Sequence, residues 1–451
     1  MEGWNLPSSL PSEGESLELA KKVLELGWKK GVYVEVNVLG ASRTSVTASG
    51  EEHKVVQGHS WLAGVRVEGS GLAYTTSPEG LVEAFERAYK AYKALGPSKL
   101  YELGPLVDRV SQRLERPPWD VDLETKVKDV LDALKEAKGK AVVAYREVYG
   151  YKLYASSDGR EVLQRLSYSL HAANVTLAEG GNRGNGYWSV ASRKGYTTDP
   201  RTAVREAVRK AELQLRGKGL EPGLWEVALE PPAIGVMVHE ALGHMSEADH
   251  VASGSPLKKG ETVGPEFLNV SDSPGPEGEW GSIFYDDEGV KPKKVEIVKE
   301  GKVNGFLTDR KHAALLGLEP TGNGRQEDPS KPPIPRMRVT YVEPGDWRRD
   351  EVLGELKRGV LIVDTSGGNA ELDGTFFFMS QEAWYVEGGE PKYPLKPLGI
   401  AGNVLEMLKE VKAVGNELAF RPGTCGKWGQ SVPVSVGGPL TLTALRLSPP
   451  A

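Results

Sequence analysis

The first 110 residues carry two hydrophobic periods. Over residues 17–28 apolar side chains recur at the three- and four-residue spacing of an α-helix, and Gly31 follows the basic last turn. Over residues 32–40 every second residue is apolar, which is typical of a strand with one buried face, and similar runs continue to about residue 74. We therefore expect residues 1–110 to form an N-terminal α+β region.

The same succession of patterns follows further along the chain. A polar stretch with two prolines, residues 113–122, is typical of a linker. After it the pattern predicts a helix over residues 122–139 and strands over residues 141–156 and 162–178. We expect residues 119–220 to form a second α+β region.

Both regions end on one sequence signature. Tyr74-Thr75-Thr76-Ser77-Pro78 matches Tyr196-Thr197-Thr198-Asp199-Pro200, and an amphipathic helical pattern follows each. Ser77 and Asp199 are the expected N-caps, and a proline takes the first helical position. Two unrelated helix starts could share this common capping chemistry. Because helix, strands, cap and helix recur in the same order, we predict an internal repeat.

From residue 223 onward the chain changes to many short strand-like runs separated by glycine-containing turns. We expect residues 223–451 to be a β-rich catalytic domain. The fold class is then α+β: an N-terminal helix and β-meander region with an internal repeat, followed by a β-rich C-terminal metal-binding domain. The glycine-rich run over residues 180–186 lacks the ending of a phosphate loop, so we predict a plain loop there.

Composition narrows the class of protein. A chain of 451 residues is too long for one core, and about two or three domains are expected. The net charge of −6 argues against a nucleic-acid partner. No apolar run could span a bilayer, and the first residues lack the pattern of a secretory signal. One cysteine, Cys425, excludes an intrachain disulfide and fits a reducing compartment, so we expect a cytoplasmic protein without membrane contact.

Candidate chemistry lies in one predicted helix. His239 and Glu240 are adjacent, and His244 follows five residues after His239. Zinc hydrolases with an HExxH motif place the two histidines four residues apart, about 40° around a helix, whereas a five-residue step turns about 140°. Both imidazoles can face one ion only if a π-bulge realigns them or if the chain leaves the helix at Gly243. We therefore predict a local irregularity between Glu240 and His244.

Glu240 is the candidate general base, because a carboxylate beside a metal can take the proton of an attacking water. A helix that merely carries these residues is the alternative. However, three of the seven histidines fall close together at His239, His244 and His250. A buried glutamate beside a histidine also needs a partner. The motif therefore favours a metal site.

The spacing of residues in the sequence does not identify the third metal ligand. His250 lies six residues after His244, as in HExxHxxGxxH proteases, but Glu247 stands where those proteases have glycine. Glu247 and Asp249 offer oxygen ligands. Cys425 is flanked by nearby glycines that let the backbone bend, although a lone cysteine is more often an apolar filler.

Four segments, taken in order, resemble the TldD/PmbA family of peptidases. They are HEALGHMSEAD from His239, DDEG from Asp286, TGNGR from Thr321 and CGKWGQSVPVSVGGP from Cys425. The resemblance covers most of the chain. TldD-like chains of that family carry HExxxH and a distant cysteine, and PmbA-like chains lack them, so this sequence resembles the TldD kind.

The resemblance implies a set of roles and partners. Zinc would be held by His239, His244 and Cys425, with Glu240 catalytic. It also implies a dimer, often a heterodimer with a PmbA-like subunit and otherwise a homodimer, that acts on unfolded peptides. A site of two imidazoles, one thiolate and an open position is typical of catalytic zinc, although such a site can also hold iron.

We therefore predict a zinc metallopeptidase that hydrolyses peptide bonds in unstructured peptides by a metal-bound water activated by Glu240. One alternative is a non-catalytic peptide-binding subunit with a structural metal, which would have no use for Glu240. Another is a metal-dependent amidase on small molecules. Because the third region is rich in short strands, we also expect the substrate to bind as an added strand along a sheet edge.

Overall fold

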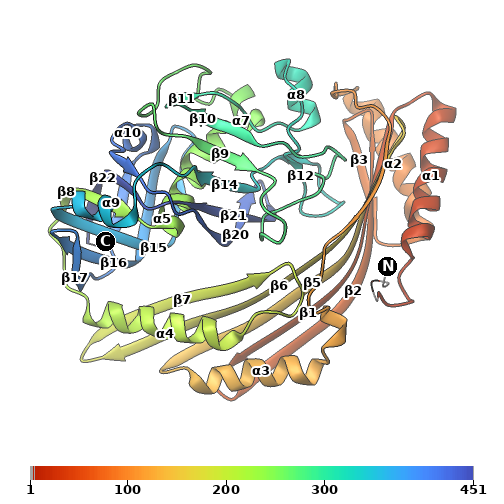
Figure 1. Ribbon diagram of the computed structural model, residues 1–451. Helices are drawn as coiled ribbons and strands as arrows, with labels where there is room; N and C mark the ends of the chain where they lie inside the picture. Colours follow the sequence, from red (N-terminus) through yellow and green to blue (C-terminus); the bar gives the residue numbers. More distant parts are fainter. Residues whose placement is uncertain (1–3, 5, 450–451) are drawn as a thin grey trace.

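A computed structural model describes residue 4 and residues 6–449 (Figure 1). The first half builds one seven-stranded sheet with four helices. Its elements are α1 (Glu13–Lys30), β1 (Val34–Ser49), β2 (Glu52–Val67), β3 (Gly71–Thr75), η1 (Pro78–Gly80), α2 (Leu81–Leu95), β4 (Leu106–Ser111), η2 (Pro118–Asp120), α3 (Leu123–Glu136), β5 (Lys140–Ser156), β6 (Arg160–Glu179), β7 (Asn182–Ser192) and α4 (Pro200–Arg216).

Local signals explain most of these helix ends. The N-terminus of α1 has a capping box, in which Ser12 Oγ accepts from the Glu15 N–H and the Glu15 carboxylate accepts from the Ser12 N–H. Gly31 ends the helix in the left-handed conformation, as predicted. Asp199 caps α4 as expected. Ser77 does not cap α2, because a 3₁₀ turn precedes that helix and the Ser77 side chain makes no capping bond.

The predicted internal repeat is confirmed. Helix, three strands and helix occur twice, as α1-β1-β2-β3-α2 and as α3-β5-β6-β7-α4. The two copies meet at the centre of the sheet, where β1 and β5 pair antiparallel from Glu35↔Ser156 to Ser49↔Val142. Strands of residues 1–110 and of residues 119–220 therefore share one sheet. The division of the chain at these boundaries and at residue 223 stays a prediction.

The loop predicted over residues 180–186 is wrong in its second part. Only Gly180 and Gly181 form the turn, with φ of +56° and +81°, and Asn182 already begins β7. The remaining glycines allow α4 to pack directly on the strand. A Cβ at Gly184 would lie 2.1 Å from the Ala211 carbonyl oxygen, and one at Gly186 would lie 1.9 Å from that of Ala207.

The second half contains two larger sheets around one hydrophobic core. One has the strand order β11-β10-β9-β14-β21-β20, and the other β15-β8-β22-β18-β16-β17. The α+β class with a β-rich C-terminal part is thereby confirmed. The elements are β8 (Gly223–Leu229), α5 (Pro231–Met237), η3 (Val238–Gly243), α6 (His244–Ser246), α7 (Ala248–Ala252), β9 (Val270–Ser273), β10 (Val295–Lys299), β11 (Lys302–Val303), α8 (Arg310–Leu316), β12 (Gly324–Arg325), β13 (Ile334–Pro335), β14 (Val339–Val342), α9 (Arg349–Glu355), β15 (Arg358–Ala370), β16 (Thr375–Glu387), β17 (Glu390–Pro394), β18 (Gly399–Asn403), α10 (Val404–Lys409), β19 (Ala413–Val414), β20 (Ala419–Lys427), β21 (Gln430–Gly438) and β22 (Thr441–Ser448).

The two halves are joined by a buried network of charges. Figure 1 shows the second half on the inner side of the curved sheet, with the helices of the first half on the outer side. Arg66 of β2 pairs with Glu35 of β1 and with Glu288 of the second half, the latter at 2.7 Å. Arg310 of α8 reaches the same Glu35. Removing one partner of such a network would leave a buried charge uncompensated, so it fixes the halves relative to each other.

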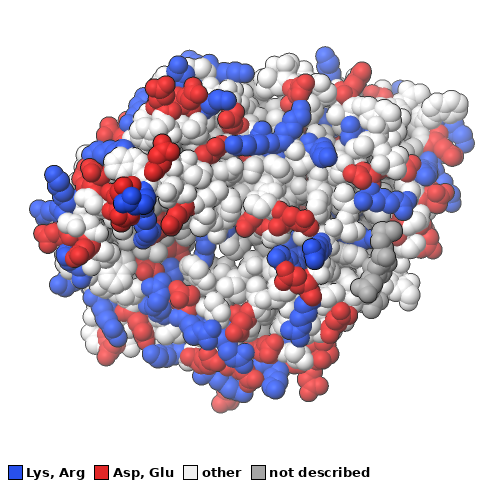
Figure 2. All heavy atoms as spheres, viewed as in Figure 1, with Lys and Arg blue, Asp and Glu red and all other residues white. Residues whose placement is uncertain are grey.

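Charges of both signs are mixed over the face drawn in Figure 2, in keeping with the small net charge of −6. Among the described residues, no helix has the length and apolar character needed to cross a membrane.

Candidate metal centre

The motif helix contains the irregularity that its spacing predicts. α5 runs into a π-helical turn, Val238–Gly243, in which the His244 N–H donates to the His239 carbonyl, five residues back. The wider turn absorbs the extra residue between the histidines. Their ring centroids lie 5.5 Å apart. The π-bulge, one of the two deviations considered from the sequence, is therefore confirmed.

Glycine lets this segment pack closely on the sheet beneath it. A Cβ at Gly235 would lie 2.3 Å from the backbone nitrogen of Gly437 in β21. A Cβ at Gly243 would lie 2.0 Å from the Met337 sulfur. At Gly235 the helix backbone thus lies directly against β21, the strand that pairs with β20.

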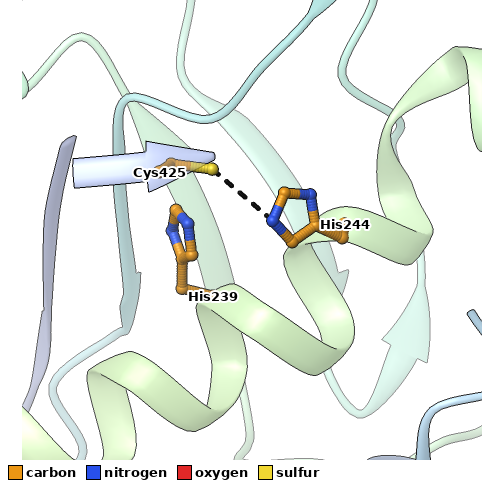
Figure 3. Close-up of side chains that lie close together, drawn as sticks. All are labelled: His239, His244 and Cys425. Atoms are coloured by element: carbon orange, nitrogen blue, oxygen red, sulfur yellow. Dashed lines mark hydrogen bonds between the residues drawn. The ribbon is translucent and has the colours of Figure 1, made fainter. Parts of the chain in front are cut away.

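Cys425 lies on β20, the last strand in the order of its sheet. Its Sγ is 3.5 Å from His244 Nε2, and the side chain is buried (Figure 3). One ligand atom each from His239, His244 and Cys425 lie within 4.8 Å of one another. The structure thus brings together residues that are 181 positions apart in the chain.

The chemistry of this donor set fits a metal ion. Both ring nitrogens of His239 are buried without a hydrogen-bond partner among the described residues. Leaving such groups unsatisfied costs free energy. A cation bound between the two imidazoles and the thiolate would satisfy one of these nitrogens, and this combination suits zinc.

The pKa values at the site reflect mutual stabilisation of opposite charges. Burial raises the pKa of the Cys425 thiol, but His239 and His244 outweigh it and hold that pKa well below its usual range. Burial lowers the pKa of His244, but the Glu247 carboxylate and Cys425 outweigh it and raise that pKa well above its usual value. These shifts favour the charged thiolate, which is the form of cysteine that binds metals.

Glu240 is placed differently from the three candidate ligands. Its side chain is 34% exposed, and its Oε2 lies 3.7 Å from His244 Nε2. Together with His239 it lines a cavity of about 750 Å³ between the sheet of the first half and the second half. A carboxylate at this position can reach both the candidate metal site and a ligand in the cavity.

The other candidate ligands form a second group. Glu247, Asp249 and His250 have ligand atoms within 4.8 Å of one another, and this second group touches the first through Glu247, whose Oε2 lies 2.8 Å from His244 Nδ1. His250 Nδ1 lies 2.7 Å from the His244 carbonyl oxygen. Lys427, which the sequence reasoning did not single out, inserts its Nζ between the two carboxylates, 2.9 Å from Glu247 and 2.8 Å from Asp249. Its position two residues after Cys425, on the same face of a strand, was the available signal.

Two family models match most of this chain. Residues 222–445 match the PmbA/TldA metallopeptidase C-terminal domain, and residues 116–215 match the central domain of the same family. The chain belongs to the PmbA/TldD family of metallopeptidases. The candidate metal centre falls wholly within the part that matches the C-terminal domain.

Relatives in this family are named as metalloproteases. A metalloprotease of Methanocaldococcus jannaschii is 33% identical over 458 residues, which cover 96% of this chain and 100% of the relative. A zinc metalloprotease TldD homolog of Saccharolobus solfataricus is 36% identical over 307 residues, which cover 67% of this chain and 69% of the relative.

Solved structures share the fold of this PmbA/TldD family member. A putative modulator of DNA gyrase from Thermotoga maritima superposes with a TM-score of 0.78 at 23% identity, covering 96% of this chain and 100% of that one. TldE from Thermococcus kodakarensis gives a TM-score of 0.76 at 21% identity, with the same coverage.

Proposed function

We propose that this chain is a TldD-like zinc metallopeptidase. His239, His244 and Cys425 hold the metal, and Glu240 acts on the attacking water. One observation carries the proposal: three metal-binding atoms meet within 4.8 Å, beside a carboxylate that faces a cavity. The name of the Saccharolobus relative includes zinc, which supports that choice of metal, although the donor set can also hold iron.

Each group at the proposed site has its own role in peptide hydrolysis. A bound zinc ion would supply Lewis-acid stabilisation of the charge that develops on the scissile carbonyl oxygen. Glu240 takes a proton from water as the water oxygen bonds to the carbonyl carbon. It then gives that proton to the leaving nitrogen as the C–N bond breaks. The buried side chains of His239 and Cys425 are shielded from bulk water, which strengthens the electrostatic interactions at the site.

The position of β20 supports an extended peptide as the substrate. This strand ends its sheet in the described part of the chain, and its residues 421–424 line the cavity that contains Glu240. A peptide added along such an edge is held by backbone hydrogen bonds and needs no particular sequence. Part of the edge is already used, because Trp280 Nε1 donates to the Gly423 carbonyl at 3.1 Å. The substrate would therefore pair with the remaining edge groups.

We further propose that the chain works as a cytoplasmic dimer, with a PmbA-like subunit or with a second copy of itself. The family resemblance supports the pairing. The single cysteine of the sequence, Cys425, can form no intrachain disulfide, which supports a reducing compartment.

Metal analysis and proteolysis test the proposal together. We expect one zinc per chain and cleavage of a disordered protein such as casein, with both lost on treatment with a chelator and cleavage restored by zinc. Bound metal without cleavage, even with a PmbA-like partner present, would favour the non-catalytic peptide-binding subunit. Turnover of small amides but not of casein would favour the amidase.

A further inference from the structure

A buried ion-pair cluster lies directly behind His244. Glu247 Oε2 is 2.8 Å from His244 Nδ1, on the side of the ring opposite to Cys425. The same oxygen is 2.9 Å from Lys427 Nζ, which also lies 2.8 Å from Asp249. The side chains of Glu247, Asp249 and Lys427 are at most 4% exposed.

The contact with Glu247 decides how the His244 ring is presented. An imidazole that donates from Nδ1 to a carboxylate has its Nε2 free to bind a metal. The same hydrogen bond holds the ring in one orientation, because it restricts rotation about the Cα–Cβ and Cβ–Cγ bonds. Nε2 is the nitrogen that faces Cys425 Sγ at 3.5 Å. Glu247 thus selects both the tautomer and the orientation that the candidate site requires.

Lys427 connects this carboxylate to the other side of the site. It is two residues after Cys425 on β20, so both side chains project from the same face of the strand. Its ammonium group also donates to the Pro335 carbonyl at 3.1 Å. The ion pairs therefore link the strand that carries the thiolate to the segment that carries the imidazole. The ammonium group also occupies the space between the two carboxylates where a second cation would have to bind.

We propose that Glu247 is a positioning residue for His244, and that Lys427, held by Glu247 and Asp249, fixes the strand of Cys425 at the distance that one metal ion requires. This inference rests on the proposed metal site. It adds that the geometry of the site is set by a charged cluster outside the ligands.

The chain contains a matched control for the test. Lys126 of α3 and Glu147 of β5 form a buried ion pair at 2.8 Å in the first half, with side chains 5% and 2% exposed. Lys126 Nζ also donates to a carbonyl, that of Pro118, at 2.8 Å. Glu247→Gln and Glu147→Gln each remove one buried negative charge, and Lys427→Met and Lys126→Met each remove one buried positive charge. Glu247 and Lys427 lie next to the candidate ligands, whereas Glu147 and Lys126 do not.

The experiment measures zinc affinity by competition with a chelator, and the absorption spectrum of the cobalt-substituted protein. We expect Glu247→Gln to weaken zinc binding about 10- to 100-fold, as is usual when a metal-bound histidine loses its carboxylate partner. Its cobalt ligand-field bands should shift. Lys427→Met should alter the thiolate-to-cobalt charge-transfer band. Glu147→Gln and Lys126→Met should leave affinity and spectra as in the wild type.

The outcomes distinguish failure of the positioning role from failure of the proposed metal site itself. If the wild type binds no zinc, or Cys425→Ser binds it equally well, the proposed site itself fails. If Cys425→Ser loses zinc while Glu247→Gln matches Glu147→Gln in affinity and spectrum, the positioning role is overturned. Should Glu247→Gln not fold, Glu247→Asp keeps the charge beside Lys427 but withdraws the oxygen from Nδ1. Weaker zinc binding by Glu247→Asp supports the role, and unchanged binding overturns it.

Discussion

The Glu240 side chain is partly exposed and lines the cavity beside the candidate metal site. We predict that Glu240→Gln keeps the metal and lowers the rate of peptide cleavage by about 10²- to 10⁴-fold, because glutamine has the same shape but cannot accept a proton. Zinc content and the initial rate on casein are the measurements. Wild-type activity in this variant would remove Glu240 from the mechanism.

The sequence left Cys425, His250, Glu247 and Asp249 open as the third ligand, and the structure groups only Cys425 with both His239 and His244. Cys425→Ser should therefore empty the site, because a serine hydroxyl does not ionise near neutral pH. His250→Ala should retain most of the metal, since His250 contacts the His244 carbonyl. Metal analysis of both purified variants checks this, and the reverse result would make His250 the ligand.

His171 makes the folding stability of the protein depend on pH. Burial lowers the pKa of this histidine from 6.5 to about 4. Between pH 6.5 and 4 the unfolded chain therefore binds the proton that the folded chain excludes, and stability falls as the pH falls through that window. At pH 5 the loss relative to pH 7 should be about 2 kcal/mol.

Urea midpoints at pH 7 and pH 5 measure this loss. His171→Gln should reduce the difference between the two pH values by about that amount. The exposed His53, changed to glutamine, serves as the control and should leave the difference as in the wild type. Equal pH dependence in wild type and His171→Gln would contradict the assignment.

At the scale of elements, α5 packs closely against β21. We predict that Gly235→Ala destabilises the protein by about 1–3 kcal/mol, because the added methyl group would meet the backbone of Gly437, which cannot turn aside. Gly354 in α9 is exposed and has nothing within 4 Å of its Cβ position, so Gly354→Ala should stabilise by about 0.4–1 kcal/mol. Thermal midpoints of the two variants, shifting in opposite directions, check this contact.

At the scale of the whole molecule, the candidate site opens on a cavity between the two halves, not on a flat surface. A folded protein can place a strand in such a cavity only after local opening, which costs free energy. We predict that a small stable domain resists cleavage while its destabilised, unfolded variant is cut rapidly. Rates on the two forms, with the stability of each known, are the measurement. Equal rates would argue for recognition of a local sequence instead of an extended, unfolded chain.

The fold was largely accessible from local patterns. Alternating apolar residues and capping signals predicted the helices and long strands of the first half, and the shared signature before α2 and α4 predicted the repeat. These signals act over a few residues, so one sequence suffices to detect them. The error at Gly184 and Gly186 has the opposite origin. A side chain at either position would collide with α4, an element some twenty residues away in the chain. The neighbouring residues of the strand therefore give no sign that glycine is required there.

The sequence by itself determined which atoms could hold a metal and that the helix between Glu240 and His244 had to depart from α geometry, because a five-residue step cannot place two side chains on one face. Only the tertiary structure decided that Cys425 and not His250 lies with both histidines, and that Lys427 joins the strand to the helix. The reason is physical. Helical spacing is fixed by the backbone, whereas contacts between residues about 180 positions apart depend on how whole sheets and helices pack, which no local pattern encodes.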